Sequence, residues 1–286
     1  MRLSECLAHF LTQCDADGRS SHTRAQHERS IRWLIEALSD RDVDEVGHED
    51  IARFLVSDAA RKTRFGFAKS EATTNALRTS VRCFFRYAHD AGYARVNAAR
   101  LVRRALCSPA PPRGLSDDEL ARLEAIMAGA WSESARRDRV LVHLLLATGI
   151  RLGSALALDV RDADLDRGEL ALRTMKNASV GRVYLNARVA DELRSLIGKR
   201  GDGPLFASQS GERLGRRHAQ RRVVGWLRAA GARTATAHTL RHCFGQRLID
   251  KTGDLALVQA AMCHRSVVST TVYVRVSPER LRAAVS

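Results

Sequence analysis

The chain has 286 residues, of which 45% are hydrophobic, enough for one large domain or two ordinary ones with a buried core. It holds 47 lysine and arginine residues against 32 aspartate and glutamate residues, a formal net charge of +15. Such an excess favours a polyanionic partner, and nucleic acid is the first candidate. The simpler alternative is a basic surface that serves only solubility.

The cysteines and the apolar runs argue against a secreted or membrane protein. No two of the six cysteines form a C-x-x-C pair, so neither a disulfide framework nor a zinc knuckle is predicted. The N-terminal stretch MRLSECLAHFLTQCDADGRSS lacks the apolar run of a signal peptide, and the longest apolar run, around VLVHLLLATGI, is too short for a bilayer. We expect a cytoplasmic protein that makes no membrane contact.

Before residue 107 the periodicity is helical, and we expect about four helices there. The segment 73–92 has apolar residues at helical spacing on one face. Its other face carries three arginines, Arg78, Arg82 and Arg86. This face is either a solvated helix surface or a DNA contact, and the segment alone fits both equally. The acidic stretch 40–50 is interpreted as a solvated loop, in preference to a contact with a neighbour's arginines.

A break in the pattern follows at CSPAPPRGLSDDEL, which holds three of the chain's five prolines. Proline fixes φ and removes a backbone donor, so this stretch predicts an extended linker. Ser116 then opens the pattern S-D-D-E, a capping box that predicts a helix from about Asp117. We therefore expect two domains, 1–106 and 116–286, joined by a linker at 107–115.

After the linker the pattern is mixed. An apolar helix is predicted from Arg139 to Ala147, ending at Thr148-Gly149. GELALR and GRVYLN, on either side of TMKNASV, predict the two strands of a hairpin, and the chain is helical again from Val189. The predicted fold class is mainly α with a small antiparallel β-sheet in the second domain.

The most basic segment is RLGRRHAQRRVVGWLRAAGAR, residues 213–233. As a helix it would show arginines on one face and Val223, Val224 and Leu227 on the other. This is a candidate for a helix that lies against DNA. Besides the three arginines of 73–92, the residues expected to contact DNA are Arg216, Arg217, Arg221 and Arg222.

Several polar residues lie in apolar surroundings. Arg151 directly follows LLLATGI at a predicted helix end, where a buried guanidinium needs an anion, either a carboxylate or a ligand phosphate. The other residues of this kind are Lys176 at the hairpin tip, His238, Arg241 and His242 within HTLRH, and then His264 and Tyr273.

Three interpretations compete for these residues. His238 and His242 are spaced i, i+4, as zinc ligands often are, but no carboxylate lies within HTLRHCFGQRL and Arg241 would repel a dication. A structural role suits each residue singly better than it suits the set. The third interpretation is phosphoryl transfer without a metal, in which guanidinium and imidazole donors stabilise charge on a phosphodiester under attack. It requires a nucleophile, such as a deprotonated tyrosine, and a general acid, such as lysine.

The order Arg…Lys…H-x-x-R…His…Tyr resembles the tyrosine site-specific recombinases, the family of phage-type integrases and Xer-like chromosome resolvases. ATGIRLGSALALDVRD resembles the segment around the family's first arginine, and DADLDRGELALRTMKNASVGRVYLN resembles its hairpin with the catalytic lysine. HTLRHCFGQRL matches the H-x-L-R-H box, and CHRSVVSTTVYVRV matches the stretch from the second histidine to the nucleophile. The likeness is strong after Ser116. It is looser before that residue, where SEATTNALRTSVRCFFRYAHDAGYARVNAA resembles the end of the core-binding domain.

The resemblance implies a role for each matching residue. Tyr273 would attack the scissile phosphate and form a 3′-phosphotyrosyl link, and Lys176 would protonate the departing 5′ oxygen. Arg151 and Arg241 would clamp the phosphate oxygens. The two histidines of the pattern, His238 and His264, would assist, one in proton transfer from the tyrosine and one by hydrogen-bonding the phosphate. His242 would support the site.

The resemblance also implies an architecture and partners. The fold would be a two-domain, C-shaped DNA clamp with a helical SAM-like core-binding domain and a C-terminal catalytic domain. Four protomers would act on two double-stranded DNA sites through a Holliday junction, and the protein would be associated with the nucleoid when bound. No metal and no cofactor would be needed, and an accessory DNA-bending or directionality protein is a further candidate partner.

The sequence departs from the family pattern at two places. The carboxylate usual three residues after the first arginine is replaced by Ser154, so support of that arginine is expected from elsewhere, with Asp159 and Asp162 as candidates. The Leu-Gly pair usual before the second histidine is Met262-Cys263, which adds bulk. Neither change removes a reacting group.

Other functions stay open at this point. A type IB topoisomerase shares much of this constellation and relaxes supercoils as a monomer. A catalytically silent DNA-binding protein is the second alternative, although the complete set of six residue types argues against it. A zinc-dependent nuclease is the third, and metal analysis would reveal it.

Overall fold

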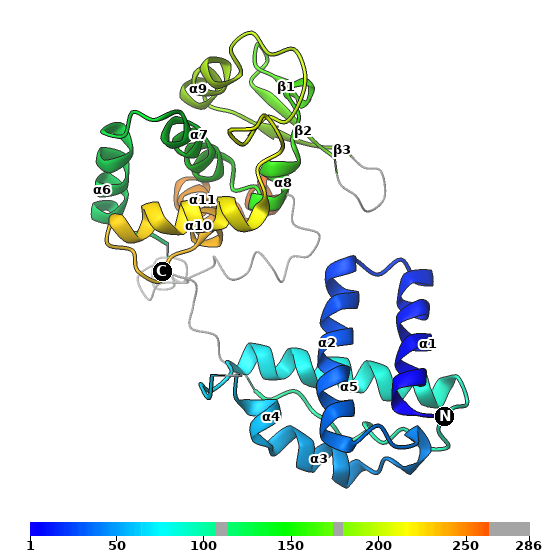
Figure 1. Ribbon diagram of the computed structural model, residues 1–286. Coiled ribbons are helices and arrows are strands. Elements are labelled where there is room, and N and C mark those ends of the chain that lie inside the picture. The colour runs from blue at the N-terminus through cyan, green and yellow to red at the C-terminus, as the bar shows by residue number, and fades with distance from the viewer. Residues whose placement is uncertain (64, 107–113, 174–179, 263–286) are drawn as a thin grey trace, which may run out of the picture. The chain divides into compact units, whose positions relative to one another are not determined.

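The computed structural model of the chain describes residues 1–63, 65–106, 114–173 and 180–262 (Figure 1). The chain divides into two compact units, Met1–Pro109 and Ala110–Ser286. Each unit has a hydrophobic core of its own.

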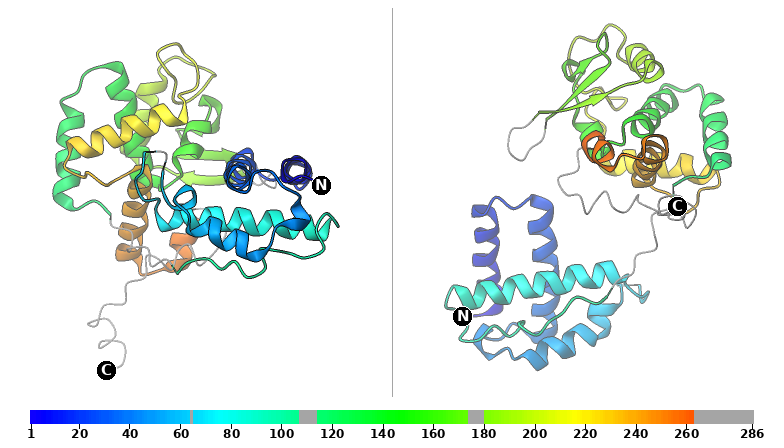
Figure 2. Two further views of the ribbon diagram at one scale, coloured as in Figure 1. Left: turned by 60° about the horizontal axis from the view of Figure 1, so that its bottom comes forward. Right: turned by 180° about the vertical axis from the view of Figure 1, so that it is seen from behind.

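The first unit is built from helices. Its elements are α1 (Leu3–Ala16), α2 (Ser21–Leu38), the 3-10 helix η1 (Val43–Glu45), α3 (His48–Val56), α4 (Asp58–Arg61) and α5 (Glu71–Asp90). The described part thus has five α-helices, where periodicity predicts about four, because α4 is a single turn and too short to show a period. Figures 1 and 2 show α1 and α2 side by side, with α5 running across them.

Helix α5 supplies the centre of the first core, which confirms the amphipathic pattern of 73–92. Its buried residues include Leu77, Val81, Phe84, Phe85 and Ala88. The ring of Phe10 on α1 lies edge-on to Phe84, with ring centroids 5.8 Å apart. The two aromatic residues thereby join α1 to α5.

The segment 91–105 returns along α5 and is fixed near both of its ends. Near its start, the N–H groups of Tyr93 and Ala94 donate to the carbonyl of Ala88 at 2.8 and 3.0 Å. Near its end, the buried Asn75 side chain donates to the carbonyl of Ala105 at 3.0 Å and accepts from its N–H at 2.8 Å. This segment therefore forms part of the surface beside α5.

The second unit combines helices with a small sheet. Its elements are α6 (Asp117–Ala128), α7 (Glu133–Thr148), α8 (Leu152–Ala157), the 3-10 helix η2 (Val160–Asp162), β1 (Ala163–Asp164), β2 (Glu169–Arg173), β3 (Val180–Tyr184), α9 (Ala187–Ile197), α10 (Arg216–Ala229), α11 (Ala237–Thr252) and α12 (Leu255–Ala261). The strands pair antiparallel in the order β1-β2-β3, with Leu170 opposite Val183. This confirms the predicted hairpin strands and the fold class.

Capping serines decide where two of these helices begin. The hydroxyl of Ser116 accepts from the N–H of Glu119 at 3.2 Å, and the Glu119 carboxylate accepts from the N–H of Ser116 at 2.8 Å, so α6 starts where the capping box predicts. Helix α7 starts earlier than its apolar pattern predicts, because Ser132 caps it. Its polar first turns include Arg137 and Asp138, which are buried and form an ion pair at 3.0 Å.

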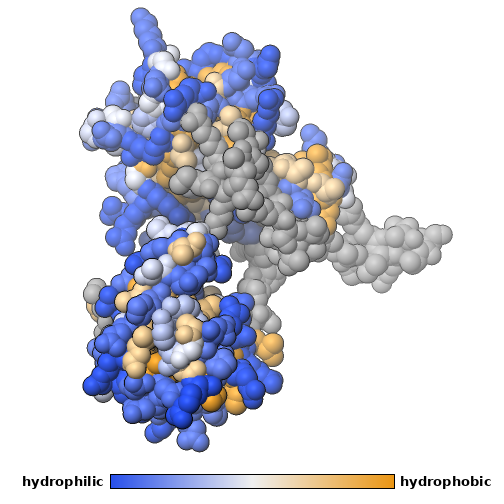
Figure 3. All heavy atoms as spheres, turned by 90° about the vertical axis from the view of Figure 1, so that its right-hand side faces the viewer, coloured by the Kyte–Doolittle hydropathy of each residue, from blue (hydrophilic) through white to orange (hydrophobic). Residues whose placement is uncertain are grey.

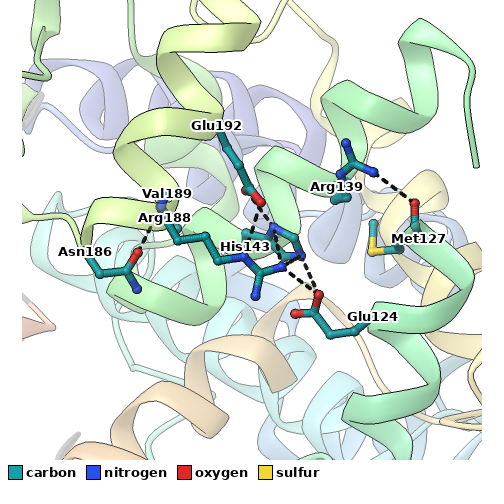
Figure 4. A network of polar contacts seen from close by, with 8 residues as sticks. All are labelled: Glu124, Met127, Arg139, His143, Asn186, Arg188, Val189 and Glu192. Atoms are coloured by element: carbon teal, nitrogen blue, oxygen red, sulfur yellow. Dashed lines mark hydrogen bonds and ion pairs between the residues drawn. The ribbon is translucent and has the colours of Figure 1, made fainter. Parts of the chain in front are cut away.

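Helix α7 also carries a buried histidine that joins three helices (Figure 4). Nδ1 of His143 lies 2.6 Å from Oε2 of Glu192 on α9, and its Nε2 lies 3.1 Å from Oε2 of Glu124 on α6. Arg188 of α9 donates to the same two carboxylates, at 2.8 Å to Glu124 and 3.3 Å to Glu192. The network therefore connects α6 and α9 across α7.

Hydrophilic residues make up most of the coloured surface in Figure 3. Within the described ranges, no helix combines the length and the apolar character needed to cross a membrane.

Candidate active site

The structure describes three of the six predicted catalytic residues: Arg151, His238 and Arg241. The other three, Lys176, His264 and Tyr273, lie outside the described residues, as does Cys263. Arg151 is the N-cap of α8, and the other two lie on α11; both helices pack against α7.

The turn between α7 and α8 depends on Gly149. This residue ends α7 in the left-handed conformation, with φ 62°, and its N–H donates to the carbonyl of Leu145 at 2.9 Å. A Cβ at this position would overlap the ring of Phe244 on α11. Glycine is therefore required by the backbone conformation and by the close packing together. The turn places Arg151 as the N-cap of α8.

Arg151 is exposed, and its guanidinium has no hydrogen-bond or ion-pair partner among the described residues. The two carboxylates considered for its support are engaged elsewhere. Asp159 pairs with Arg213, which also donates to two carbonyls at the end of α8, and Asp162 accepts from the N–H of Asp159 at 2.9 Å. Arg151 is thus available to bind an anion.

Arg241 lies in a different environment, with only 2% of its surface exposed. Its Nη1 donates to the carbonyl of Gly149, and its Nη2 donates to the carbonyl of Met262 at 2.8 Å. These bonds offset part of the cost of burying the charge. They also hold the end of α7 and the end of α12 against α11. In this structure the guanidinium faces the protein interior, and its expected role in clamping a phosphate oxygen stays a prediction.

His238 lies on the first turn of α11, where Thr236 caps the helix and accepts from the His238 N–H at 3.2 Å. Partial burial lowers the pKa of His238 below its ordinary value of 6.5, and the positive charges of Arg241 and Arg151 lower it further. The imidazole is therefore neutral at neutral pH and able to accept a proton.

The ring of His242 contacts that of His238 edge to face, with centroids 4.5 Å apart and an angle of 81° between the planes. Along the described ranges, no three His, Cys, Asp or Glu side chains gather in a way that could hold a metal ion.

The arginines predicted to contact DNA lie on α5 and α10. Arg82 and Arg86 are exposed on α5, and Arg78 is half-buried. On α10, three of the four arginines predicted to contact DNA are exposed, Arg216, Arg217 and Arg221, while Val223 and Leu227 are buried as predicted. The side chains of these six arginines have no hydrogen-bond or ion-pair partner in the described part of the chain. They are free to bind an anionic ligand.

Arg222 differs from its neighbours on α10. Its guanidinium lies 2.6 Å from Oδ2 of Asp138, which also accepts from the indole N–H of Trp226 at 3.0 Å. Asp138 is fully buried and also pairs with Arg137, so it depends on these cationic partners. The contact ties α10 to α7, which gives Arg222 a structural role that its position in the sequence does not indicate.

Two supporting residues were not anticipated from the sequence. Phe244 packs on Gly149, and a helix end marked by glycine is the one signal that points to such a close approach. Arg213 binds the end of α8 across more than 50 residues of chain, and no local pattern indicates that contact.

Comparison with known proteins covers both units. The model of the phage integrase family matches residues 113–280, and that of the phage integrase N-terminal SAM-like domain matches residues 9–92. Tyrosine recombinase XerD of Mycobacterium leprae is 30% identical over 282 residues, which cover 92% of this chain and 89% of that protein. Tyrosine recombinase XerC of Mycobacterium bovis is 33% identical over 301 residues, which cover 98% of this chain and 96% of that protein.

Solved structures share the fold at lower identity. The XerH site-specific recombinase bound to palindromic difH substrate is 24% identical, with a TM-score of 0.75 and coverage of 98% of this chain and 84% of that one. The Tn1549 transposon integrase in complex with circular intermediate DNA is 20% identical, with a TM-score of 0.78 and coverage of 100% and 99%. The family match and the relatives agree: the chain belongs to the phage integrase family and is a tyrosine recombinase.

Proposed function

We propose that the chain is a site-specific DNA recombinase that cleaves and rejoins DNA through a 3′-phosphotyrosyl intermediate. Its family membership supports this function, as does a sequence that fills all six expected catalytic positions. Solved structures with this fold contain bound DNA: XerH is bound to difH substrate, and lambda integrase is bound to a COC′ core site.

One observation carries the proposal: Arg241, one turn after His238 on α11, donates to the carbonyl of Gly149 at the end of α7, two residues before Arg151. The exposed guanidinium of Arg151 suits a phosphate oxygen, because it can donate two parallel hydrogen bonds. Arg241 holds the surrounding backbone in place and adds positive charge near His238. Preorganised donors of this kind stabilise charge that develops on a phosphate under attack.

The reaction then assigns a role to each group. The hydroxyl oxygen of Tyr273 attacks phosphorus, forming a tyrosyl–phosphate bond while the bond to the 5′ oxygen breaks. The neutral imidazole of His238 accepts the tyrosine proton, and Lys176 donates a proton to the 5′ oxygen. Arg151 and Arg241 clamp the non-bridging oxygens, and His264 donates a hydrogen bond to the phosphate. Because the phosphotyrosyl bond conserves the energy of the broken one, attack by another 5′ hydroxyl rejoins the DNA without a cofactor.

The two parts of the chain divide the work. In this proposal residues 116–286 form the catalytic domain, residues 1–106 form the SAM-like core-binding domain, and residues 107–115 link them. The arginines of α5 and α10 that lack ionic partners bind the phosphate backbone. Four protomers act on two DNA sites through a Holliday junction. A lambda integrase tetramer has been solved bound to a Holliday junction.

Covalent capture of DNA tests the function. The protein is mixed with fragments of its own genome in EDTA, quenched with SDS and examined for DNA that stays attached. Tyr273→Phe should abolish attachment. Tyr184→Phe, which changes an exposed tyrosine on β3, should leave it intact. Sequencing the captured DNA then identifies the target site.

The other outcomes are distinct. Attachment that persists in Tyr273→Phe contradicts the assigned nucleophile. Relaxation of supercoiled DNA without sequence preference would indicate a topoisomerase-like enzyme. Tight binding by the wild type without any covalent product would indicate a silent DNA-binding protein.

A further inference from the structure

A basic pocket lies on the first unit, between α5 and the returning segment 91–105. Its volume is about 210 Å³, and its lining includes Thr79, Arg82, Cys83, Arg86, Asn97 and Arg100. Arg82 and Arg86 come from successive turns of α5, and Arg100 reaches the same pocket from the segment that follows the helix. The pocket thus brings together guanidinium groups from two parts of the chain.

The position of Arg100 is set by its neighbours. Ala99 is buried against the core, and its N–H donates to the side-chain oxygen of Asn97 at 3.1 Å. The N–H of Arg100 donates to the carbonyl of Asn97 at 3.1 Å, which closes a tight turn. Because the segment is also held at Ala94 and Ala105, the turn stays beside α5.

The charge in this pocket is not compensated by the described protein. No acidic residue lines it, and the side chains of Arg82, Arg86 and Arg100 have no hydrogen-bond or ion-pair partner among the described residues. In contrast, Arg95 of the same segment pairs with Asp44 at 2.7 Å. Three like charges that share a pocket repel one another, and a bound anion removes that repulsion.

We propose that this pocket binds one backbone phosphate of the DNA and that Arg100 completes the site. The inference rests on the proposed function. A phosphate presents only acceptor oxygens, which match guanidinium donors that can bind in pairs. The acceptor edge of a guanine can also bind one arginine, but three guanidinium groups in one pocket match the several acceptor oxygens and the negative charge of a phosphate better. The contact would therefore position the first unit on the duplex without reading its sequence.

The salt dependence of DNA binding tests the site, because each neutralised phosphate adds about 0.9 to the slope of log K against log salt. The full chain is titrated with the duplex recovered by covalent capture. Arg100→Gln should weaken binding to every duplex and lower the slope by about 1. Arg95→Gln removes an equal charge from the same segment but breaks an internal pair, and it should leave the slope unchanged. Equal slopes for Arg100→Gln and wild type would overturn the proposal.

Cys83 offers a second measurement in the same pocket. Its side chain is half-buried at the pocket wall, whereas Cys6, Cys14 and Cys243 are buried. Alkylation by N-ethylmaleimide, followed peptide by peptide in a mass spectrometer, should slow at Cys83 when DNA is bound. Arg100→Gln should reduce this protection. Unchanged alkylation of Cys83 under saturating DNA would place the phosphate elsewhere and refute the site.

The two proposals fail in different ways. A wild-type chain that neither binds nor cleaves DNA would refute the proposed function. A chain that binds and cleaves normally, with Arg100→Gln indistinguishable from wild type, would refute the phosphate site alone. Thermal unfolding of Arg100→Gln shows whether the fold is intact, and we expect little change because the side chain is exposed.

Discussion

His238 is the residue whose chemistry the structure specifies most directly. Partial burial, with the charges of Arg241 and Arg151, places its pKa below 6.5, so the imidazole is neutral and can accept the tyrosine proton. We expect the rate of covalent complex formation to hold as pH falls from 8 to about 6.5, and then to decline as pH passes through the lowered pKa. A single-turnover pH–rate profile measures this. Decline beginning well above pH 6.5 would contradict the assignment.

The cause of the lowered pKa can be tested without activity. Arg151 is exposed, so Arg151→Gln should fold normally and remove one of the two charges near His238. Nuclear magnetic resonance titration of the ring protons should then show the pKa moving up, toward the ordinary value. Arg161→Gln, which alters an exposed arginine paired with Asp159, is the matched control and should leave the His238 titration in place.

For single residues, the sequence predicts which residue types form the site better than it predicts how each side chain is buried and bonded. The H-x-x-R pattern identifies His238 and Arg241 as a pair, but it does not indicate that Arg241 is buried against two carbonyls. Likewise, Arg222 lies among exposed arginines in the sequence, yet a buried carboxylate on α7 engages it. Such contacts depend on segments that meet only after folding, so no local pattern contains them.

At the scale of elements, the sequence predicts the ends of helices and strands where a short run of residues sets them. The capping box at Ser116 starts α6, and the alternation in GELALR and GRVYLN matches β2 and β3. The sequence does not predict the single turn of α4, because four residues cannot show a helical period. The sequence also does not predict that segment 91–105 returns along α5. This course depends on the hydrogen bonds between Asn75 and Ala105, which are 30 residues apart.

The network around His143 shows how α6 is held to α7 and α9, and it predicts a response to acid. Although partial burial opposes it, the hydrogen bond and charge of Arg188, together with His143, hold the pKa of Glu124 below its ordinary value of 4.5. The carboxylate therefore stabilises the fold above pH 4.5, and this contribution is lost as pH falls through the lowered pKa. Glu124→Gln should destabilise the protein at pH 7 by about 1 kcal/mol or less, because the side chain is partly exposed.

Chemical denaturation across the acid range measures that effect. The difference between Glu124→Gln and wild type should shrink as pH falls, because the wild-type carboxylate becomes neutral too. Asp202→Asn, which changes an exposed residue without a partner in the described chain, should differ little from wild type throughout. If the free energies of unfolding of Glu124→Gln and wild type differ by the same amount at every pH, the ionised carboxylate contributes nothing to stability.

At the scale of the whole molecule, the ion pairs indicate which arginines are available to bind DNA, and the net charge of +15 does not. Many arginines are paired with acids, as Arg53 is with Asp50 and Arg194 is with Asp191. Those on the exposed faces of α5 and α10 have no such partner among the described residues. A group of arginines without acidic partners therefore lies on one helix of each unit. Counting residues in the sequence cannot reveal this, because paired and unpaired arginines count alike.

Two triple variants test whether DNA binding depends on where the arginines lie or only on the net charge. Replacing Arg216, Arg217 and Arg221 on α10 by glutamine removes three charges that lack partners. Replacing Arg161, Arg182 and Arg194 by glutamine removes three that are paired with carboxylates. If net charge alone drives binding, both variants lose affinity equally. We expect instead that the α10 variant lowers the salt slope by up to about 3 and that the control lowers it by less than about 1. Fluorescence anisotropy over a range of salt concentrations decides between them, and equal slopes would show that α10 does not lie on the DNA.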